Sequence, residues 1–243
     1  MGISAVIITK NESKYIKMCL ESLKFAGEII IIDDFSSDKT IDIARDFTDK
    51  IYQRHLDNFA AQRNFGIEKA KGEWILSLDG DEVVSEELAE ELSLINKNTN
   101  IIQKGFYVPF RQYFFGKEIK YGGWHPDYHM RFFRKGWGRW EKPVHEELVI
   151  KGKTGRLEGH LIHYLYENIS EFINKINFYT SKDVEEGNVD GNILKTFLAP
   201  PKVFLYRYIF RQGFRDGRYG LIIALFMSFY VLILRLKKWE KQF

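Results

Sequence analysis

The sequence has little cysteine and lacks several motifs that would assign a chemistry at once. Cys19 is the single cysteine among 243 residues, which excludes an internal disulfide framework and a four-cysteine zinc site. No GxGxxG and no GxxxxGK[ST] segment is present, so a Rossmann-type dinucleotide fold and a P-loop ATPase lose their main support. The first six residues lack the basic region and the cleavage signature of a secretory signal, which predicts a cytoplasmic protein.

Charge is distributed unevenly along the chain, whose net charge is +3. Residues 202–243 contain nine Lys or Arg and two acids, a net charge of +7 that leaves −4 for residues 1–201. The basic residues of this end alternate with long aliphatic runs, so we expect it to contact an anionic membrane surface and no nucleic acid. The hydrophobic content of 45% supports a real core over the rest of the chain.

Short apolar runs alternate with helix-like stretches over the first hundred residues. This alternation, with short connections, predicts an α/β fold with a mostly parallel central sheet flanked by helices. Beyond residue 100 the pattern weakens, although two aromatic segments still predict strands. The predicted strands are 2–9, 28–32, 51–52, the apolar run within 72–78 that leads into Asp79, 106–115 and 128–133. The predicted helices are 11–23, 36–47, 59–70, 85–95 and 171–183.

Pro200-Pro201 is the best candidate for a domain boundary. We therefore expect a catalytic domain at 1–200, with a donor half at about 1–100 and an acceptor half at about 101–200, and a basic apolar helical segment at 201–243. Its apolar run 219–234 would span about 24 Å as a helix, short of the roughly 30 Å hydrocarbon core. An interfacial or re-entrant membrane segment is expected. The alternative is a helix packed on the core or at a dimer interface.

Acidic residues follow two of the predicted strands. Asp79-Gly80-Asp81 ends one buried strand, and Asp33-Asp34 ends another. Open α/β sheets bind ligands at the carboxyl ends of their strands. Carboxylates this close repel each other unless a cation lies between them, and a hard divalent ion often joins such carboxylates to the phosphates of a substrate. The hypothesis is a metal–nucleotide site, although Asp33-Asp34 alone could be a helix-capping turn.

Two further side chains are candidates for chemistry. Arg63 lies in the helix-like stretch before the Asp79 strand and could clamp a diphosphate with its planar guanidinium. The alternative is a solvated helix arginine. Glu146 lies in an aromatic-rich loop and could act as a general base. The alternative is that Glu146 and Glu147 are surface acids in a turn. His125-Pro126-Asp127 is a polar segment among aromatic residues and could form part of an acceptor pocket.

Four segments resemble, in their order and spacing, the family 2 glycosyltransferases of the GT-A fold. Two later segments, 142–146 and 213–217, are similar to the bacterial lipopolysaccharide-core β-glucosyltransferase branch of that family. The resemblance covers nearly the whole chain. The four segments are VIITKNE at 6–12, DDFSSDKT at 33–40, AQRNFGI at 61–67 and GEWILSLDGDE at 72–82.

The resemblance implies an inverting hexosyltransferase that uses one Mg²⁺ or Mn²⁺ ion. The donor would be a nucleotide-sugar resembling UDP-glucose, and the acceptor a lipid-linked glycan such as the lipopolysaccharide or lipooligosaccharide core. The protein would then be peripheral on the inner, cytoplasmic face of the cell membrane. Alternatives are transfer to a polyprenyl phosphate or to a surface-polysaccharide intermediate, and a catalytically silent peripheral membrane protein.

The resemblance also assigns roles to individual residues. Asp34 would contact the base or ribose, Arg63 the diphosphate, and Asp79 the ribose or the metal shell. Asp81 would bind the metal and Glu146 would be the catalytic base. Gly80 replaces the alanine common at this position in the family and would add backbone freedom. Further donor-binding residues would be Thr9, Asn11, Glu12 and Asn64; His145 would neighbour the metal or a phosphate; and the acceptor pocket would hold Trp124, His125, Asp127 and Glu147.

Overall fold

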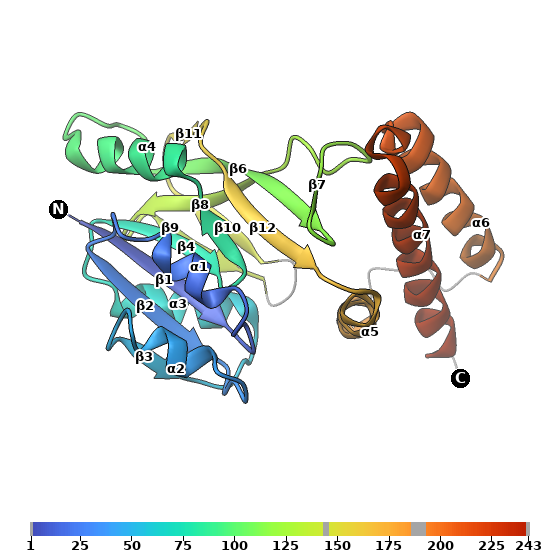
Figure 1. Cartoon of the computed structure of the whole chain (residues 1–243), viewed down its shortest axis with the longest axis horizontal. Helices are drawn as coiled ribbons and strands as arrows, with labels where there is room; N and C mark the ends of the chain where they lie inside the picture. Colours follow the sequence, from blue (N-terminus) through green and yellow to red (C-terminus); the bar gives the residue numbers. More distant parts are fainter. Residues whose placement is uncertain (1, 143–145, 186–192, 242–243) are drawn as a thin grey trace. The chain divides into compact units, whose positions relative to one another are not determined.

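The computed structural model describes residues 2–142, 146–185 and 193–241 (Figure 1). The chain forms two compact units, each built from two separate stretches of sequence. The first unit contains Met1–Phe110 and Asp127–His163, and the second contains Arg111–Pro126 and Tyr164–Phe243. Strands β6 (Gly105–Phe114) and β12 (Leu161–Tyr166) contribute residues to both units.

The first half of the first unit has the predicted parallel sheet. The order of its strands is β3-β2-β1-β4, with every pair parallel. All seven residues of β1 are buried, because the strand is central and its apolar side chains pack into cores on both faces. The strands are β1 (Ile3–Thr9), β2 (Glu28–Asp33), β3 (Ile51–Gln53) and β4 (Trp74–Asp79), and they alternate with α1 (Ile16–Glu21), α2 (Thr40–Ala44) and α3 (Phe59–Lys69) (Figure 1).

The sheet continues as an antiparallel half that the sequence pattern predicts only in part. Beyond β4 the order is β8-β6-β12-β5. Strands β6 and β8 (Tyr128–Arg134) match predicted segments, whereas the other strands have only three to six residues, too few for a clear periodicity. These are β5 (Glu82–Val84), β7 (Lys117–Ile119), the hairpin of β9 (Gly138–Glu141) with β10 (Glu147–Ile150), β11 (Thr154–Arg156) and β12; helix α4 (Glu86–Lys97) follows β5.

Glu28, at the start of β2, joins three segments of the first unit. Its carboxylate accepts hydrogen bonds from the Ser4 hydroxyl at 2.5 Å and from the Gly72 amide at 3.1 Å, and it pairs with Lys50. Burial opposes ionisation, but the hydrogen bonds from Lys50 and Ser4 outweigh it and lower the pKa of Glu28 to about 2. The ionised form therefore stabilises the fold.

Replacing Glu28 by glutamine is expected to cost about 1–2 kcal/mol of unfolding free energy near neutral pH. Because the folded pKa lies below the ordinary value of 4.5, this contribution is present above about pH 4.5 and is lost as the pH falls toward 2. Urea unfolding of both proteins across that window measures it. The matched control is Glu21→Gln, which removes only a surface pair with Lys17. Equal stability of Glu28→Gln and wild type at pH 7 would contradict the assignment.

The second unit contains three long helices. Helices α6 (Ile193–Leu205) and α7 (Gly217–Glu240) pack antiparallel and are joined by a π-helical turn, Tyr206–Phe210, and a 3₁₀ turn, Gly213–Asp216 (Figure 1). Helix α5 (Ile169–Glu185) packs against α7. Helix α6 runs through Pro200 and Pro201 without a break, so the prolines do not end the helix as a boundary there would suggest. Division of the chain at residue 200 stays a prediction.

Helix α7 is longer than the apolar run predicts. It has 24 residues, which corresponds to about 36 Å rather than about 24 Å, because the helix continues through Arg235, Lys237 and Lys238. The charged residues after position 234 end the apolar run, but they do not end the helix. By length and composition the segment Gly213–Glu240 could cross a membrane. The interfacial or re-entrant placement of this segment stays a prediction.

Candidate active site

The carboxyl ends of β1, β2 and β4 lie at one edge of the sheet, as the sequence pattern predicts. In the register of the parallel strands, Thr9 pairs with Asp33, and Ile8 pairs with Asp79. Strand β1 therefore places the two acidic strand ends on either side of itself. The Thr9 hydroxyl is buried at this edge and has no hydrogen-bond partner among the described residues.

The adjacent acids Asp33 and Asp34 have different environments. Asp33 is fully buried and accepts hydrogen bonds from the Ser36 amide at 2.9 Å and from Gln53 at 3.2 Å, so it closes the turn after β2. Asp34 pairs with Lys10 at 2.6 Å and accepts from the Leu56 amide at 3.1 Å. Asp33 therefore stabilises this turn but caps no helix, because α2 begins at Thr40 and has no side-chain cap, while Asp34 lies at the rim.

An aromatic pair beside Asp34 was not predicted. Phe35 has a φ of 48° and stacks on His55 with 4.1 Å between ring centroids. Both side chains are exposed, and His55 Nδ1 lies 3.8 Å from Asp34 Oδ1. The sequence signal was weak, since Phe35 is one aromatic residue among many and His55 follows 20 residues later.

Arg63, on α3, is buried between two carboxylates. Its Nη2 lies 2.7 Å from Asp79 Oδ1 and 3.3 Å from Glu146 Oε1, and its guanidinium stacks over the Trp140 ring at 4.7 Å. The side chain is 3% exposed, which excludes the solvated-arginine alternative. The structure therefore brings together Arg63, Asp79 and Glu146, three of the predicted site residues.

Arg131, on β8, is a second buried arginine that sequence reasoning missed. Its Nη2 donates to Asp79 Oδ2 at 3.2 Å and to Glu82 Oε1 at 2.7 Å. Glu82 is fully buried, and its other oxygen accepts the Asp79 amide at 3.0 Å. Burial raises the pKa of Glu82 to about 7, against the opposing effect of Arg131. Burial would also raise the pKa of Asp79, but Arg63 and Arg131 outweigh it and hold that pKa well below its usual range.

Replacing Arg131 by methionine is expected to cost about 3 kcal/mol of unfolding free energy, because it leaves the Glu82 carboxylate buried without its cation. The double variant Arg131→Met/Glu82→Met is expected to recover most of that loss, since an apolar pair can replace a buried ion pair. Chemical denaturation measures both. The control Arg134→Met removes a more exposed pair with Glu73 and should cost under about 1 kcal/mol. If Arg131→Met is as stable as Arg134→Met, the ion pair of Arg131 with Glu82 contributes little to stability.

Asp81, the predicted metal ligand, faces a histidine. Its Oδ2 lies 3.6 Å from His163 Nε2, and its side chain is nearly buried. Burial opposes protonation of His163, but the neighbouring Asp81 carboxylate raises the pKa of the imidazole. The two acids of the pair therefore differ in their surroundings, since Asp79 is held by two arginines whereas Asp81 lies against an imidazole.

The donor set at Asp81 suits a hard divalent cation that is shared with a substrate. Carboxylate oxygen is the ligand that Mg²⁺ and Mn²⁺ prefer, and Mg²⁺ commonly binds through one or two carboxylates plus phosphate oxygens rather than in an all-protein cage. Within the described residues, no group of three His, Cys, Asp or Glu side chains is arranged to hold an ion. His145, the second predicted ligand, lies outside the described residues. Metal binding by Asp81 stays a prediction.

Gly80 provides room for a close approach, while the backbone freedom expected of it stays a prediction. A Cβ at this position would lie 2.7 Å from Thr9 Oγ1 and 3.1 Å from Glu12 Cγ. Its φ is not positive, so the backbone here does not require glycine's conformational range. The residue instead allows the loop after β1 to approach the Asp79–Asp81 turn closely.

Three predicted donor-binding residues make hydrogen bonds that join separate segments of the first unit. Asn11 Oδ1 accepts the Ser37 amide at 2.8 Å, and the Glu12 amide donates to the Thr40 hydroxyl at 2.8 Å. Asn64 binds the backbone of Trp140 through both ends of its amide, at 2.8 and 3.1 Å. These contacts are structural. Contacts of Asn11, Glu12 and Asn64 with a donor stay predictions.

The adjacent acids Glu146 and Glu147 are clearly distinguished. Glu146 contacts Arg63, and its side chain is 18% exposed. Glu147 begins β10, is exposed, and pairs with Lys142 at 2.8 Å. Of the two, Glu146 is therefore the one beside Asp79.

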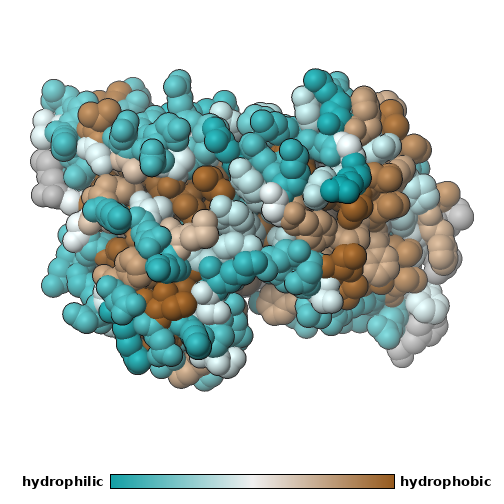
Figure 2. Space-filling view, in the orientation of Figure 1, coloured by the Kyte–Doolittle hydropathy of each residue, from teal (hydrophilic) through white to brown (hydrophobic). Residues whose placement is uncertain are grey.

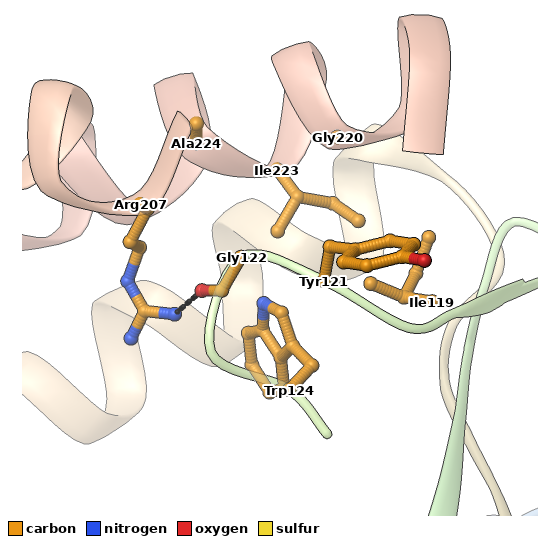
Figure 3. A pocket seen from close by; sticks show the side chains of 8 residues that line it. All are labelled: Ile119, Tyr121, Gly122, Trp124, Arg207, Gly220, Ile223 and Ala224. Atoms are coloured by element: carbon orange, nitrogen blue, oxygen red, sulfur yellow. Dashed lines mark hydrogen bonds between the residues drawn. The ribbon is translucent and has the colours of Figure 1, made fainter. Parts of the chain in front are cut away.

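The four predicted acceptor residues are divided between the two units. Asp127 and Glu147 belong to the first unit, where Asp127 lies 3.0 Å from His129 Nε2. Trp124 and His125 belong to the second, where Trp124 lines a small cavity beside α7 (Figure 3). A common acceptor pocket stays a prediction.

Comparisons with known proteins identify the family. The profile of Glycosyl transferase family 2 matches residues 4–147. The lipopolysaccharide core biosynthesis glycosyltransferase LpsC of Rhizobium meliloti is 29% identical, over 99% of this chain and 93% of that protein. The uncharacterized glycosyltransferase RP128 of Rickettsia prowazekii is 28% identical, over 97% of this chain and 86% of that protein.

Solved structures support the same fold. S. aureus TarS 1–349 in complex with UDP-GlcNAc has a TM-score of 0.51 at 15% identity, covering 98% of this chain and 89% of that one. The mannosyltransferase PcManGT of Pyrobaculum calidifontis, in complex with GDP-Man and Mn²⁺, has a TM-score of 0.54 at 12% identity, covering 98% and 87%. The predicted GT-A fold is confirmed. The family profile spans more than half of the chain and includes Arg63, Asp79 and Asp81, so this protein belongs to glycosyl transferase family 2.

Proposed function

We propose that this glycosyltransferase moves a hexose, with inversion and with the aid of a divalent cation, from a nucleotide-sugar to a lipid-linked glycan. The donor is proposed to resemble UDP-glucose, and the acceptor to be the lipopolysaccharide or lipooligosaccharide core. The observation that carries the proposal is the buried cluster of Arg63, Asp79 and Glu146 beside Asp81 at the carboxyl edge of the sheet. The name of the Rhizobium relative supports the acceptor class.

The donor would lie along this edge from Asp34 to Asp81. The exposed stack of Phe35 and His55 offers an aromatic surface for a nucleobase, and Asp34 offers a carboxylate for the base or the ribose. Arg63 would contact the diphosphate with its planar guanidinium in addition to its bonds with Asp79 and Glu146. The complexes of TarS with UDP-GlcNAc and of PcManGT with GDP-Man support a nucleotide-sugar ligand.

Asp81 would bind the cation together with the phosphates of the donor. Asp79 would contact the ribose or lie in the shell around the cation. When bound, the cation would neutralise charge on the departing nucleoside diphosphate. Arg131 and Arg63 hold Asp79 in position from both of its oxygens. The chain's own contribution at this edge is therefore a rigid, ionised carboxylate beside the proposed metal ligand.

Glu146 would accept the proton of the acceptor hydroxyl. Inverting transfer is a single displacement at the anomeric carbon and needs a base near the incoming hydroxyl. Arg63 donates to Glu146 Oε1 through Nε and Nη2, both at 3.3 Å, so it fixes the carboxylate in one orientation. Arg63 would in this way position the base as well as the leaving group.

The place of action is proposed to be the inner face of the cell membrane, where the protein would be peripheral and cytoplasmic. A lipid-linked acceptor restricts the enzyme to a membrane surface. The net charge of +7 over residues 202–243 supports an anionic surface.

The test is transfer by the purified chain with a panel of UDP- and GDP-sugars, Mg²⁺ or Mn²⁺, and lipid-linked core or polyprenyl phosphate acceptors. The proposal predicts nucleoside diphosphate release that depends on a core acceptor, and a product of inverted anomeric configuration by NMR. Transfer only to polyprenyl phosphate would correct the acceptor. Retained configuration would refute the single displacement. No transfer or donor hydrolysis with any donor would favour a catalytically silent protein.

A further inference from the structure

The turn between α6 and α7 carries a concentration of exposed apolar side chains. Phe210 is 77% exposed, the highest value for a large hydrophobic residue among those the structure describes. Figure 2 shows hydrophobic surface over the α6 and α7 part of the chain. Contiguous apolar surface of this kind marks a site of interaction. We call residues 205–214 the tip; its exposed apolar side chains are Leu205, Tyr206, Ile209, Phe210 and Phe214.

Cations surround the tip. Residues 201–218 contain five Lys or Arg and one acid, a net charge of +4. None of the five forms an ion pair with a carboxylate in the described part of the chain. Asp216, the acid, accepts the Tyr121 amide at 2.8 Å and the Lys120 amide at 3.2 Å, so it serves the backbone. The five cations are Lys202, Arg207, Arg211, Arg215 and Arg218.

The tip is held firmly within the second unit. Arg207 Nη1 donates to the Gly122 carbonyl at 3.0 Å (Figure 3). The Gly122 amide donates to the Arg211 carbonyl at 2.9 Å. A Cβ on Gly220 would lie 1.8 Å from the Gly213 carbonyl oxygen, so α7 approaches the turn as closely as glycine permits. A preformed apolar surface loses little conformational entropy when it binds.

The middle and the C-terminal end of α7 pack against α5, an amphipathic helix that carries several charged side chains. Phe226 stacks on Phe172 of α5 at 4.0 Å, and Lys237 binds Asn177 Oδ1 at 2.7 Å. Tyr230 donates to Asp183, which is buried on α5. Helix α5 also carries Glu171, Lys175, Lys182 and Glu185. If α7 crossed a bilayer with α5 attached, these charges would enter the hydrocarbon core at a cost of several kcal/mol.

We propose that the tip inserts into one leaflet of an anionic membrane, with its arginines at the level of the lipid headgroups, and that α7 does not cross the bilayer. Apolar side chains flanked by Lys and Arg match an interface of acyl chains below anionic headgroups. The inference rests on the proposed membrane-linked acceptor, and it specifies the segment and the depth. Its tests measure binding alone, so they can fail while transfer to a soluble acceptor succeeds.

The first test is flotation of the full chain with phosphatidylcholine vesicles, with and without phosphatidylglycerol. Wild type is expected to float with phosphatidylglycerol vesicles and to be released by salt. Phe210→Asp is expected to weaken binding about tenfold or more, since it removes a large apolar contact and adds a negative charge. The matched control is Leu94→Asp on α4, where the side chain is 68% exposed. Equal flotation of Phe210→Asp and wild type, or no dependence on phosphatidylglycerol, would overturn the proposal.

The second test measures depth in the membrane. A fluorophore is attached to Phe210→Cys or Phe229→Cys, while the native Cys19 is fully buried. Quencher-labelled lipids are expected to quench the label at 210 more strongly than the label at 229, which lies in the middle of α7. A deepest position at 229 would show that α7 spans the bilayer. No quenching at either site, together with dimerisation that Phe210→Asp abolishes, would assign the tip to a contact between two copies.

Discussion

Replacing Asp81 by asparagine is expected to lower the transfer rate by about 10²–10⁴-fold. The substitution keeps the size of the side chain but removes the charge that the proposed cation needs. The fold should persist, because the neighbouring network of buried ion pairs is formed by residues other than Asp81. These residues are Asp79, Glu82, Arg63 and Arg131. The measurement is steady-state transfer at saturating donor across a range of Mg²⁺ and Mn²⁺ concentrations.

The matched control for this substitution is Asp42→Asn. Asp42 is an exposed acid of α2. Its Oδ1 lies 3.5 Å from Nη1 of Arg45, three residues later in the sequence. It should leave both rate and metal dependence unchanged. If Asp81→Asn retains the wild-type rate and the wild-type metal dependence, Asp81 is not the metal ligand.

Replacing Glu146 by glutamine is expected to lower kcat by about 10²–10⁴-fold, the usual range for loss of a general base. Glutamine keeps an oxygen that can accept from Arg63, so donor affinity and thermal stability should change little. Single-turnover transfer and donor binding, measured separately, distinguish a loss of chemistry from a loss of binding.

The adjacent Glu147 provides the control for Glu146. Glu147→Gln has the same chemistry one residue later, at an exposed position paired with Lys142. It should retain nearly the full rate. The reverse outcome, a slow Glu147→Gln and an active Glu146→Gln, would transfer the role of base to Glu147.

The parallel half of the fold could be predicted because β1, β4 and most of β2 are buried on both faces. Such strands are continuous apolar runs, and acids directly after them must lie at the carboxyl edge. The apolar runs alone therefore place Thr9, Asp34 and Asp79 at one rim. The antiparallel half could not be predicted in this way, because β9 to β12 are short and part exposed, so their sequences show no clear period.

The pairing of buried charges was much harder to predict. Arg131 is one basic residue in an aromatic strand, and its partners Asp79 and Glu82 lie 52 and 49 residues earlier. No local pattern connects them, since the pairing of β4 with β8 creates the contact. For Arg63, spacing left a diphosphate clamp and a solvated surface residue equally open, and burial excluded the second.

The resemblance added what spacing could not provide. Glu146 had little support from the residues alone, yet the structure places it against Arg63 and leaves Glu147 at the surface. The close approach of Thr9 and Glu12 to Gly80 could not be predicted, because it is a tertiary contact that the local sequence does not encode.

The most direct test of the central claim is the melting temperature of wild type and Asp81→Asn with a nucleotide-sugar panel, with and without Mg²⁺ or Mn²⁺. A ligand that binds only the folded state raises stability by mass action. We expect that one donor together with metal stabilises wild type more than either alone, and that Asp81→Asn loses the metal-dependent part. Equal stabilisation by the donor in the presence of a chelator, or an unchanged metal effect in Asp81→Asn, would contradict a shared metal–donor site at Asp81.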